Sequence, residues 1–294
     1  MQTLAPSFRK AERKSAKARI ALCSPAGGGK THSALLIATG LGGRIAVVDT
    51  ENGSASLEAG KAGIPDFDVL EMHAPFTPEK YVIALKTAED AGYDVVLLDS
   101  LSHAWAGTGG LLEQVDNIAR SSKSGNSYMA WKSITPMQNK LIEAILQSKC
   151  HVIGTMRTKV DFALVDDNGK KVPKKLGMAP IQREGMDYEM TICWDIDQSS
   201  HIATCTKDRT SLFDGVPQVL TIETGKTLAA WLTAGTVETQ AERRERDETE
   251  PDNSPVTDEE MAHVLGPIKD DLHIRSKTNR AAMEAGFNQA KKEV

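Results

Sequence analysis

Short apolar runs alternate with longer amphipathic stretches between residues 19 and 235. Continuous apolar runs are typical of parallel strands buried on both faces, and amphipathic stretches are typical of the helices that cover them. The pattern predicts strands over 19–23, 44–49, 94–99, 151–156, 189–196 and 201–207. It predicts helices over 30–40, 78–91, 110–119, 128–148 and 226–233. We therefore expect an α/β fold with a mostly parallel, twisted sheet flanked by helices.

The segment "LVDDNGKKV" (164–172) departs from this alternation. It places an Asn-Gly pair between β-prone flanks, and Asn-Gly is a strong signal for a tight hairpin turn. A β-hairpin is therefore expected here.

The composition changes after residue 235. "TVETQAERRERDETEPDNSP" is polar, charged and ended by prolines, as is typical of a linker or a disordered arm. Thr257 and Glu260 then have the spacing of a capping box, which predicts a helix start. We expect a basic amino-terminal arm over 1–18, a core over 19–235, an acidic linker over 236–256 and a small helical tail over 257–294.

The net charge is −5, and the charged residues are distributed unevenly along the chain. Residues 1–19 hold six basic side chains against Glu12 alone, whereas residues 236–260 hold ten acids against three arginines. Without residues 236–260, the chain has a small positive net charge. Overall acidity thus does not exclude a nucleic-acid partner.

Four cysteines lie in or beside apolar runs without a C-x-x-C pair, which indicates reduced core thiols. The seven histidines lack metal-ligand spacing, so no structural metal is expected. No apolar run is long enough to cross a membrane, and the amino terminus has no signal-like apolar segment. A cytoplasmic protein is expected.

The segment "SPAGGGKT" (24–31) is nearly a phosphate-binding loop, except that Ser24 stands where the pattern has glycine. Such a loop holds phosphate with backbone N–H groups at a helix amino terminus, and glycines allow the close approach. Ser24 is small, so the mechanism is retained. The expected ATP-binding residues are Ser24, Pro25, Ala26, Gly27, Gly28, Gly29, Lys30, Thr31 and His32.

Acidic residues follow two of the predicted strands. Asp99 follows the apolar run of "DVVLLDS" (94–100), where it can hold Mg²⁺ together with the hydroxyl of Thr31. "VVDTENGS" places Asp49 and Glu51 at the same edge of the sheet. Glu51 is two residues beyond the strand core, and we expect it to act on the water that attacks the γ-phosphate.

Several segments occur in the order and approximate spacing of the ATPase core of RecA-type recombinases: "SPAGGGKT", "VVDTE", "LLDSLSHAW", "GNSYMAWKS" and "TKDRT". The chain resembles the phage family of shortened RecA-like ATPases, which includes ATP-dependent single-strand annealing proteins. The resemblance covers roughly residues 8–235. It implies a RecA-like P-loop NTPase core and ATP hydrolysis with Mg²⁺.

The resemblance also implies roles for individual residues. Glu51 would be the catalytic carboxylate, Lys30 and Thr31 would contact phosphate and metal, and Asp99 would be the second metal residue. Lys207 and Arg209 of "KDR" resemble the basic pair that RecA-like proteins insert into a neighbour's ATP site. The usual glutamine that senses nucleotide state is missing, and Thr155 or Arg157 would replace it.

Two segments match the DNA-binding loops of RecA-like proteins, 119–129 and 157–183. The second holds seven basic residues against three acids, and such loops suit contacts to phosphates without reading sequence. Tyr128 or Phe162 is available for stacking on bases. The expected DNA-binding residues are Lys123, Tyr128, Arg157, Lys159, Lys170, Lys171, Lys174, Lys175 and Arg183.

Phe8 and Ala11 have the F-x-x-A spacing by which RadA-type recombinases join one subunit to the next. We expect an ATP-dependent, single-stranded-DNA-binding recombination protein that promotes annealing or strand pairing as a ring or filament. A single-strand-binding protein is a further candidate partner, through the acidic segment. The alternatives are another DNA motor (helicase, helicase loader or packaging ATPase), a P-loop kinase of small molecules, and a scaffold that binds ATP without turnover.

Overall fold

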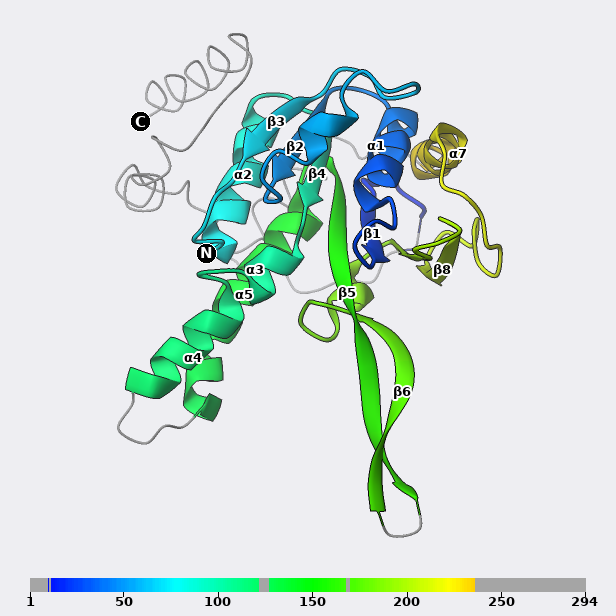
Figure 1. Ribbon diagram of the computed structural model, residues 1–294. Helices are drawn as coiled ribbons and strands as arrows, with labels where there is room; N and C mark the ends of the chain where they lie inside the picture. Colours follow the sequence, from blue (N-terminus) through cyan, green and yellow to red (C-terminus); the bar gives the residue numbers. More distant parts are fainter. Residues whose placement is uncertain (1–9, 11, 122–126, 168–169, 236–294) are drawn as a thin grey trace, which may run out of the picture.

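The computed structural model describes residues 10, 12–121, 127–167 and 170–235. Its centre is an eight-stranded sheet in the order β3-β2-β4-β5-β1-β7-β8, with β6 paired to β5 alone (Figure 1). The strands are β1 (Arg19–Ser24), β2 (Ile45–Asp49), β3 (Asp68–Glu71), β4 (Val95–Asp99), β5 (His151–Asp167), β6 (Lys170–Pro180), β7 (Ile192–Ile196) and β8 (Ala203–Asp208). Only β5–β6 and β7–β8 are antiparallel among these strand pairs. The mostly parallel α/β fold predicted from the sequence is confirmed.

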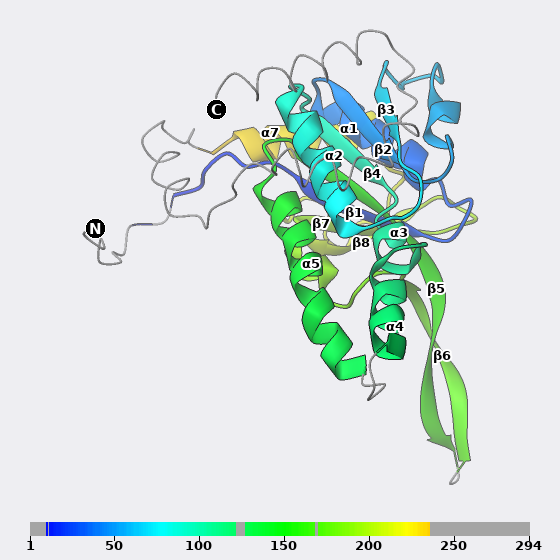
Figure 2. The same ribbon diagram turned by 90° about the vertical axis from the view of Figure 1, so that its left-hand side faces the viewer.

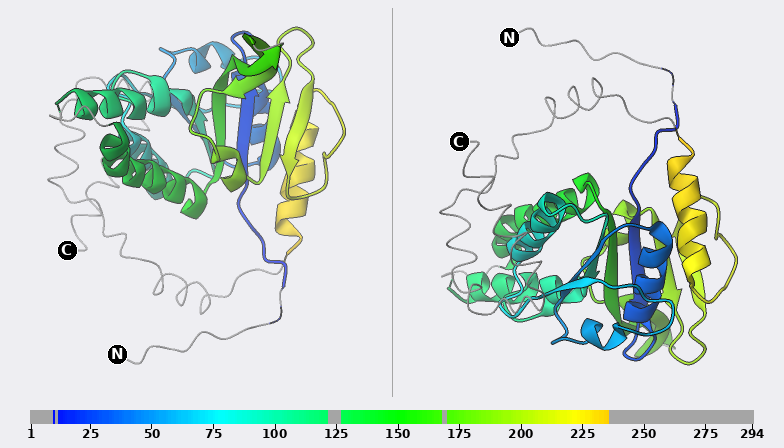
Figure 3. Two further views of the ribbon diagram at one scale, coloured as in Figure 1. Left: turned by 90° about the horizontal axis from the view of Figure 1, so that it is seen from below. Right: turned by 90° about the horizontal axis from the view of Figure 1, so that it is seen from above.

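Helices lie on both faces of the sheet (Figure 3). They are α1 (Lys30–Leu41), the short 3-10 helix η1 (Ala55–Glu58), α2 (Pro78–Asp90), α3 (Ser102–Ala106), α4 (Leu111–Ser121), α5 (Ser127–Gln147), α6 (Met186–Glu189) and α7 (Ile222–Thr233).

The central strand β1 is buried along its whole length, and its side chains alternate between two cores. Ile20 and Leu22 pack with α1 and α7, whereas Ala21 and Cys23 pack with α2 and α5. Because successive strand residues point to opposite faces, a strand covered on both sides has to be apolar throughout. This requirement explains why the apolar runs predicted the central strands correctly.

Four short elements were missed, namely β3, η1, α3 and α6. The strand expected over 189–196 begins at Ile192, since Glu189 is the last residue of α6 and Met190 caps that helix. The helix expected from 226 begins at Ile222, where Thr221 and Thr224 form a capping box. The sequence did not predict this first turn because it contains Gly225, and glycine disfavours helices.

Two projections leave the carboxyl-terminal edge of the parallel strands on the same side (Figures 1 and 2). The expected hairpin is confirmed but is longer than predicted, with β5 and β6 paired from Thr158–Pro180 to Asp167–Lys170. The second projection consists of α4 and α5. It has a small core of its own, made of Leu111, Val115, Ala130 and Ile134.

The part of the amino-terminal arm that the structure describes contacts the last turn of α7 of the same chain. Ala16 N donates to Leu232 O at 3.2 Å, and the Arg13 guanidinium lies 3.9 Å from the centre of the Trp231 ring. Phe8, Ala11, the acidic linker and the tail lie outside the described residues, so the division into domains stays a prediction. Within the described part, no helix has the length and apolar character needed to cross a membrane.

Candidate active site

The phosphate loop joins β1 to α1, as its glycines predict. Gly27 and Gly29 have φ angles of 79° and 81°, which L side chains rarely adopt. A Cβ at Gly28 would lie 1.7 Å from Ser24 Oγ. Ser24 therefore occupies the space beside Gly28, and its buried hydroxyl has no hydrogen-bond partner among the described residues. The substitution that set this loop apart from the usual pattern is accommodated by the absence of a side chain at Gly28.

Lys30 is the first residue of α1 and is almost fully buried. Its Nζ donates to Ser24 O at 3.1 Å and to Pro25 O at 3.0 Å, so the ammonium group lies inside the loop. Burial lowers the pKa of Lys30, and the nearby carboxylates of Glu51 and Asp99 oppose that shift. An ammonium group at this place is suited to the charge of a bound phosphate.

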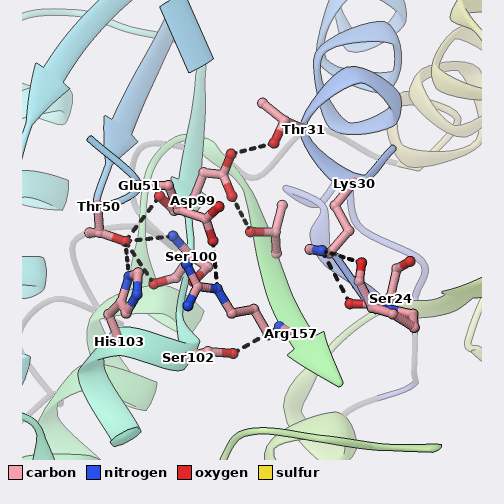
Figure 4. A network of polar contacts seen from close by, with 12 residues as sticks. Ser24, Lys30, Thr31, Thr50, Glu51, Asp99, Ser100, Ser102, His103 and Arg157 are labelled. Atoms are coloured by element: carbon pink, nitrogen blue, oxygen red, sulfur yellow. Dashed lines mark hydrogen bonds and ion pairs between the residues drawn. The ribbon is translucent and has the colours of Figure 1, made fainter. Parts of the chain in front are cut away.

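Asp99 ends β4, where Figure 4 shows it beside Thr31, and it is fully buried. It accepts hydrogen bonds from Thr31 Oγ1 at 2.6 Å and from Thr155 Oγ1 at 2.5 Å. Burial raises the pKa of this carboxyl group, and the two hydroxyl donors partly offset the shift. The fold thus brings together Thr31 and Asp99, the two residues predicted to hold Mg²⁺. Thr155, a candidate sensor, contacts the same carboxylate.

Glu51 lies just beyond β2 and forms an ion pair with Arg157, whose Nε is 2.9 Å from Glu51 Oε1 (Figure 4). Asp49 is engaged differently: its carboxylate accepts the backbone N–H groups of Glu51 and Ala55 at 2.6 and 2.9 Å. Asp49 therefore shapes the turn after β2. Glu51 is instead held by a side chain, the guanidinium of Arg157.

Arg157 stands where β5 leaves the central sheet and enters the hairpin. Its register partner in β1 is Ser24, and its carbonyl accepts the N–H of Ile181 beyond β6 at 2.7 Å. Its own N–H donates to Ser102 Oγ at 2.9 Å. A residue expected to contact DNA or to sense nucleotide thus joins the hairpin to Glu51.

Thr50 and His103 belong to this network and were missed by sequence reasoning. Thr50 Oγ1 lies 2.6 Å from His103 Nδ1 and accepts the N–H of Ser100 at 2.8 Å (Figure 4). His103 also stacks on Phe76 at 4.8 Å between ring centres. Burial, helped by Arg157, lowers the pKa of His103 and favours a neutral ring. The stretch "LLDSLSHAW" contained the histidine, but no local pattern connected it with Thr50.

Lys207 and Arg209 lie far from the phosphate loop of their own chain. In β8, Thr204 is opposite Asp195, whose partner in β1 is Cys23, directly before the loop. Lys207 is opposite Cys193, which lies further from the loop along β7. Lys207 Nζ donates to Asp187 O at 2.6 Å, and Arg209 Nη2 donates to Tyr188 O at 2.5 Å. Lys207 and Arg209 are therefore not among the residues that can contact a phosphate in the loop of their own chain. A role in a neighbouring subunit's site stays a prediction.

The expected DNA-binding residues lie on or beside the two projections. Tyr128 on α5 is 76% exposed, and Lys159 on β5 is exposed. Arg183, beyond β6, donates to Thr135 Oγ1 at 3.3 Å and lies 5.8 Å from the Trp131 ring centre. Lys123 lies outside the described residues. For Phe162, Lys170, Lys171, Lys174 and Lys175, the structure describes only the backbone of the hairpin.

A family model described as an AAA domain matches residues 16–230, which is most of the described chain. The chain belongs to this AAA domain family. It is accordingly a nucleotide-hydrolysing P-loop ATPase, which agrees with the loop, the lysine and the buried carboxylate described above. No curated protein matches the sequence.

Proposed function

We propose that this AAA domain protein is an ATP-dependent single-stranded-DNA-binding recombination protein of the phage RecA-like type. In this proposal it promotes annealing or strand pairing as a ring or filament in the cytoplasm. The observation that carries the proposal is the position of Arg157. This residue holds Glu51 through a 2.9 Å ion pair and begins the basic hairpin. DNA bound to the hairpin can thereby affect, through Arg157, the position of Glu51, the carboxylate expected to act on water.

The chain's residues fit ATP with Mg²⁺. Lys30 and the loop amides would hold the β- and γ-phosphates, and Thr31 with Asp99 would hold the metal ion. Bound Mg²⁺ supplies charge neutralisation on the phosphates. Glu51, released from Arg157, would accept a hydrogen bond from the attacking water and orient it. Thr155, which donates to Asp99, would respond to the presence of the metal ion through that hydrogen bond.

Charge and shape support DNA as the ligand of the two projections. Residues 157–183 carry seven basic side chains against three acids. On α5, Tyr128 is exposed, Lys132 is exposed one turn further along, and Arg183 approaches the same helix. Lysines and arginines beside aromatic rings suit backbone phosphates and unpaired bases.

Neutralising the hairpin lysines tests the proposal. We expect the combined change of Lys170, Lys171, Lys174 and Lys175 to alanine to weaken single-stranded-DNA binding. The slope of log affinity against log salt should fall by up to about 3, since each lost phosphate contact contributes about 0.7. DNA-stimulated ATP hydrolysis should fall with it, whereas basal hydrolysis should remain. Fluorescence anisotropy and phosphate release measure the two effects.

A matched control changes four exposed lysines away from the projections, Lys61, Lys86, Lys149 and Lys226. Unchanged DNA affinity in the hairpin variant, or an equal loss in the control, would reject the hairpin as the DNA contact. Directional unwinding of a duplex by the unmodified protein would favour a DNA motor over an annealing protein. Binding of ATP with negligible turnover, even with DNA, would favour a scaffold.

A further inference from the structure

The turn between β7 and β8, residues 197–202, lies against the phosphate loop. Gln198 Nε2 donates to Ala26 O at 2.8 Å. A methyl group placed on Gly29 would come within 3.6 Å of His201 Nδ1. Two polar side chains from a turn far away in the sequence therefore border the loop that is expected to hold phosphate.

This turn keeps its shape through its own hydrogen bonds. Asp197 Oδ1 accepts the N–H groups of Ser199 and Ser200 at 3.0 and 2.8 Å and the Ser200 hydroxyl at 2.9 Å. His201 N donates to Asp197 O at 3.0 Å, and His201 has a φ of 57°. Because Asp197 and the serines supply this framework, the Gln198 and His201 side chains are presented on a preformed turn beside the loop.

The sheet order determines which end of a nucleotide meets this turn. Glu51 and Asp99 follow β2 and β4, which lie on one side of β1, whereas β7 and β8 lie on the other side. The terminal phosphate has to face Glu51 and Asp99 for hydrolysis. The opposite end of the molecule, its sugar and base, is then directed toward β7 and the turn.

We infer that Gln198 and His201 form a binding subsite for the nucleoside part of the nucleotide. The amide of Gln198 offers both a donor and an acceptor to a base or a ribose hydroxyl. The His201 ring offers a flat face for stacking and a nitrogen for hydrogen bonding. The inference rests on nucleotide binding at the phosphate loop, and it adds an affinity determinant that acts apart from the phosphates.

Calorimetric titration with two probes, ATP and inorganic tripolyphosphate, tests the subsite. The variants are Gln198→Ala and His201→Asn, since asparagine tolerates the left-handed backbone of position 201. Each should weaken ATP binding about tenfold, as expected for a lost hydrogen bond or ring contact. His201→Asn should leave tripolyphosphate binding unchanged. Gln198→Ala also removes the hydrogen bond to Ala26 O of the loop, so it should weaken tripolyphosphate binding less than ATP binding. Ser199→Ala, in the same turn, is the matched control and should bind both probes as the unmodified protein does.

The outcomes distinguish a contact to the nucleoside from a contact to the phosphates. Unchanged ATP affinity in both variants overturns the subsite, and so does an equal loss for ATP and tripolyphosphate, which would indicate a phosphate contact. Lys30→Ala should weaken both probes together. An unmodified protein that binds neither probe would overturn nucleotide binding at the phosphate loop and the subsite with it. Thermal unfolding of each variant confirms that the fold is intact.

Discussion

At the residue scale, the site contains charged side chains whose burial lowers the free energy of unfolding. Asp99 is fully buried, and burial raises its pKa although two threonine hydroxyls donate to it. Removing a carboxylate from water costs free energy, which a metal ion would offset and two hydroxyl groups offset in part. Function therefore retains a side chain here that stability alone would not select.

Asp99→Asn should abolish ATP hydrolysis and stabilise the nucleotide-free protein at pH 7. Because the folded-state pKa of Asp99 lies above its unfolded value, the folded carboxyl group holds its proton more tightly. Its contribution to stability is lost as the pH rises from the unfolded pKa, about 4, through the folded value. We expect asparagine to raise the free energy of unfolding by about 1–2 kcal/mol, or about 2–8 °C in Tm.

Thermal unfolding without nucleotide or Mg²⁺, as a function of pH, measures the effect of Asp99→Asn. The gain should vanish near pH 4 and grow as the pH rises. Asp66→Asn, at an exposed loop position, should leave Tm unchanged. A loss of stability in Asp99→Asn at neutral pH would show that the hydroxyl donors more than offset the burial of the charge.

Ser24 and Gly28 depend on each other. Gly28→Ala should destabilise the protein by about 1–3 kcal/mol and weaken ATP binding, since its Cβ would lie 1.7 Å from Ser24 Oγ. Combining it with Ser24→Gly removes the atoms in conflict and should restore most of both properties. Thermal unfolding and ATP titration of the two single variants and the double variant measure this coupling. A double variant as impaired as Gly28→Ala would contradict it.

At the element scale, the backbones of α1 and α7 approach each other closely at two glycines. A Cβ at Gly225 would lie 2.3 Å from Ile37 O, and one at Gly40 would lie 2.1 Å from Ile222 O. The two glycines thus allow α7 to cover α1 on one face of the sheet. This contact explains why a glycine is present near the start of a helix whose first turn the sequence did not reveal.

Gly225→Ala distinguishes helix propensity from packing. Propensity alone predicts a gain of about 1 kcal/mol, because alanine is the better helix former. The close approach predicts a loss of about 1–3 kcal/mol, because the added methyl group would displace α7 from α1. We expect the loss. Chemical denaturation measures it, with Thr227→Ala on the exposed face of α7 as the control that should not destabilise.

At the scale of the whole molecule, Lys207 and Arg209 lie at the end of β8 that points away from the chain's own phosphate loop. β8 is the last strand in the sheet order. If the pair completes an ATP site, that site belongs to another subunit, and assembly and hydrolysis are linked.

Mixing two inactive variants tests this link. Glu51→Gln and Arg209→Ala should each lose assembly-dependent hydrolysis and keep ATP binding. A mixture should recover part of the activity, since Arg209 of one variant can then complete a site that contains Glu51 of the other. Phosphate release at several mixing ratios measures the recovery. Normal turnover by Arg209→Ala alone, or no recovery in the mixture, would contradict the assignment.

The sequence by itself determined the features that depend on neighbouring residues. Apolar runs predicted the central strands, the Asn-Gly pair predicted the hairpin, and the glycines before Lys30 predicted the phosphate loop. Asp99 and Glu51 were expected at one edge of the sheet because the carboxyl ends of parallel strands meet there. Each of these signals lies within a few consecutive residues.

Only the tertiary structure decided which distant side chains meet. It paired Arg157 with Glu51, joined Thr50 to His103, and brought the β7–β8 turn to the phosphate loop. It also directed Lys207 and Arg209 to the carbonyls of α6. These contacts depend on strand order, register and the direction in which each strand leaves the sheet. Such quantities are set by packing between segments far apart in the chain, so no local pattern of residues encodes them.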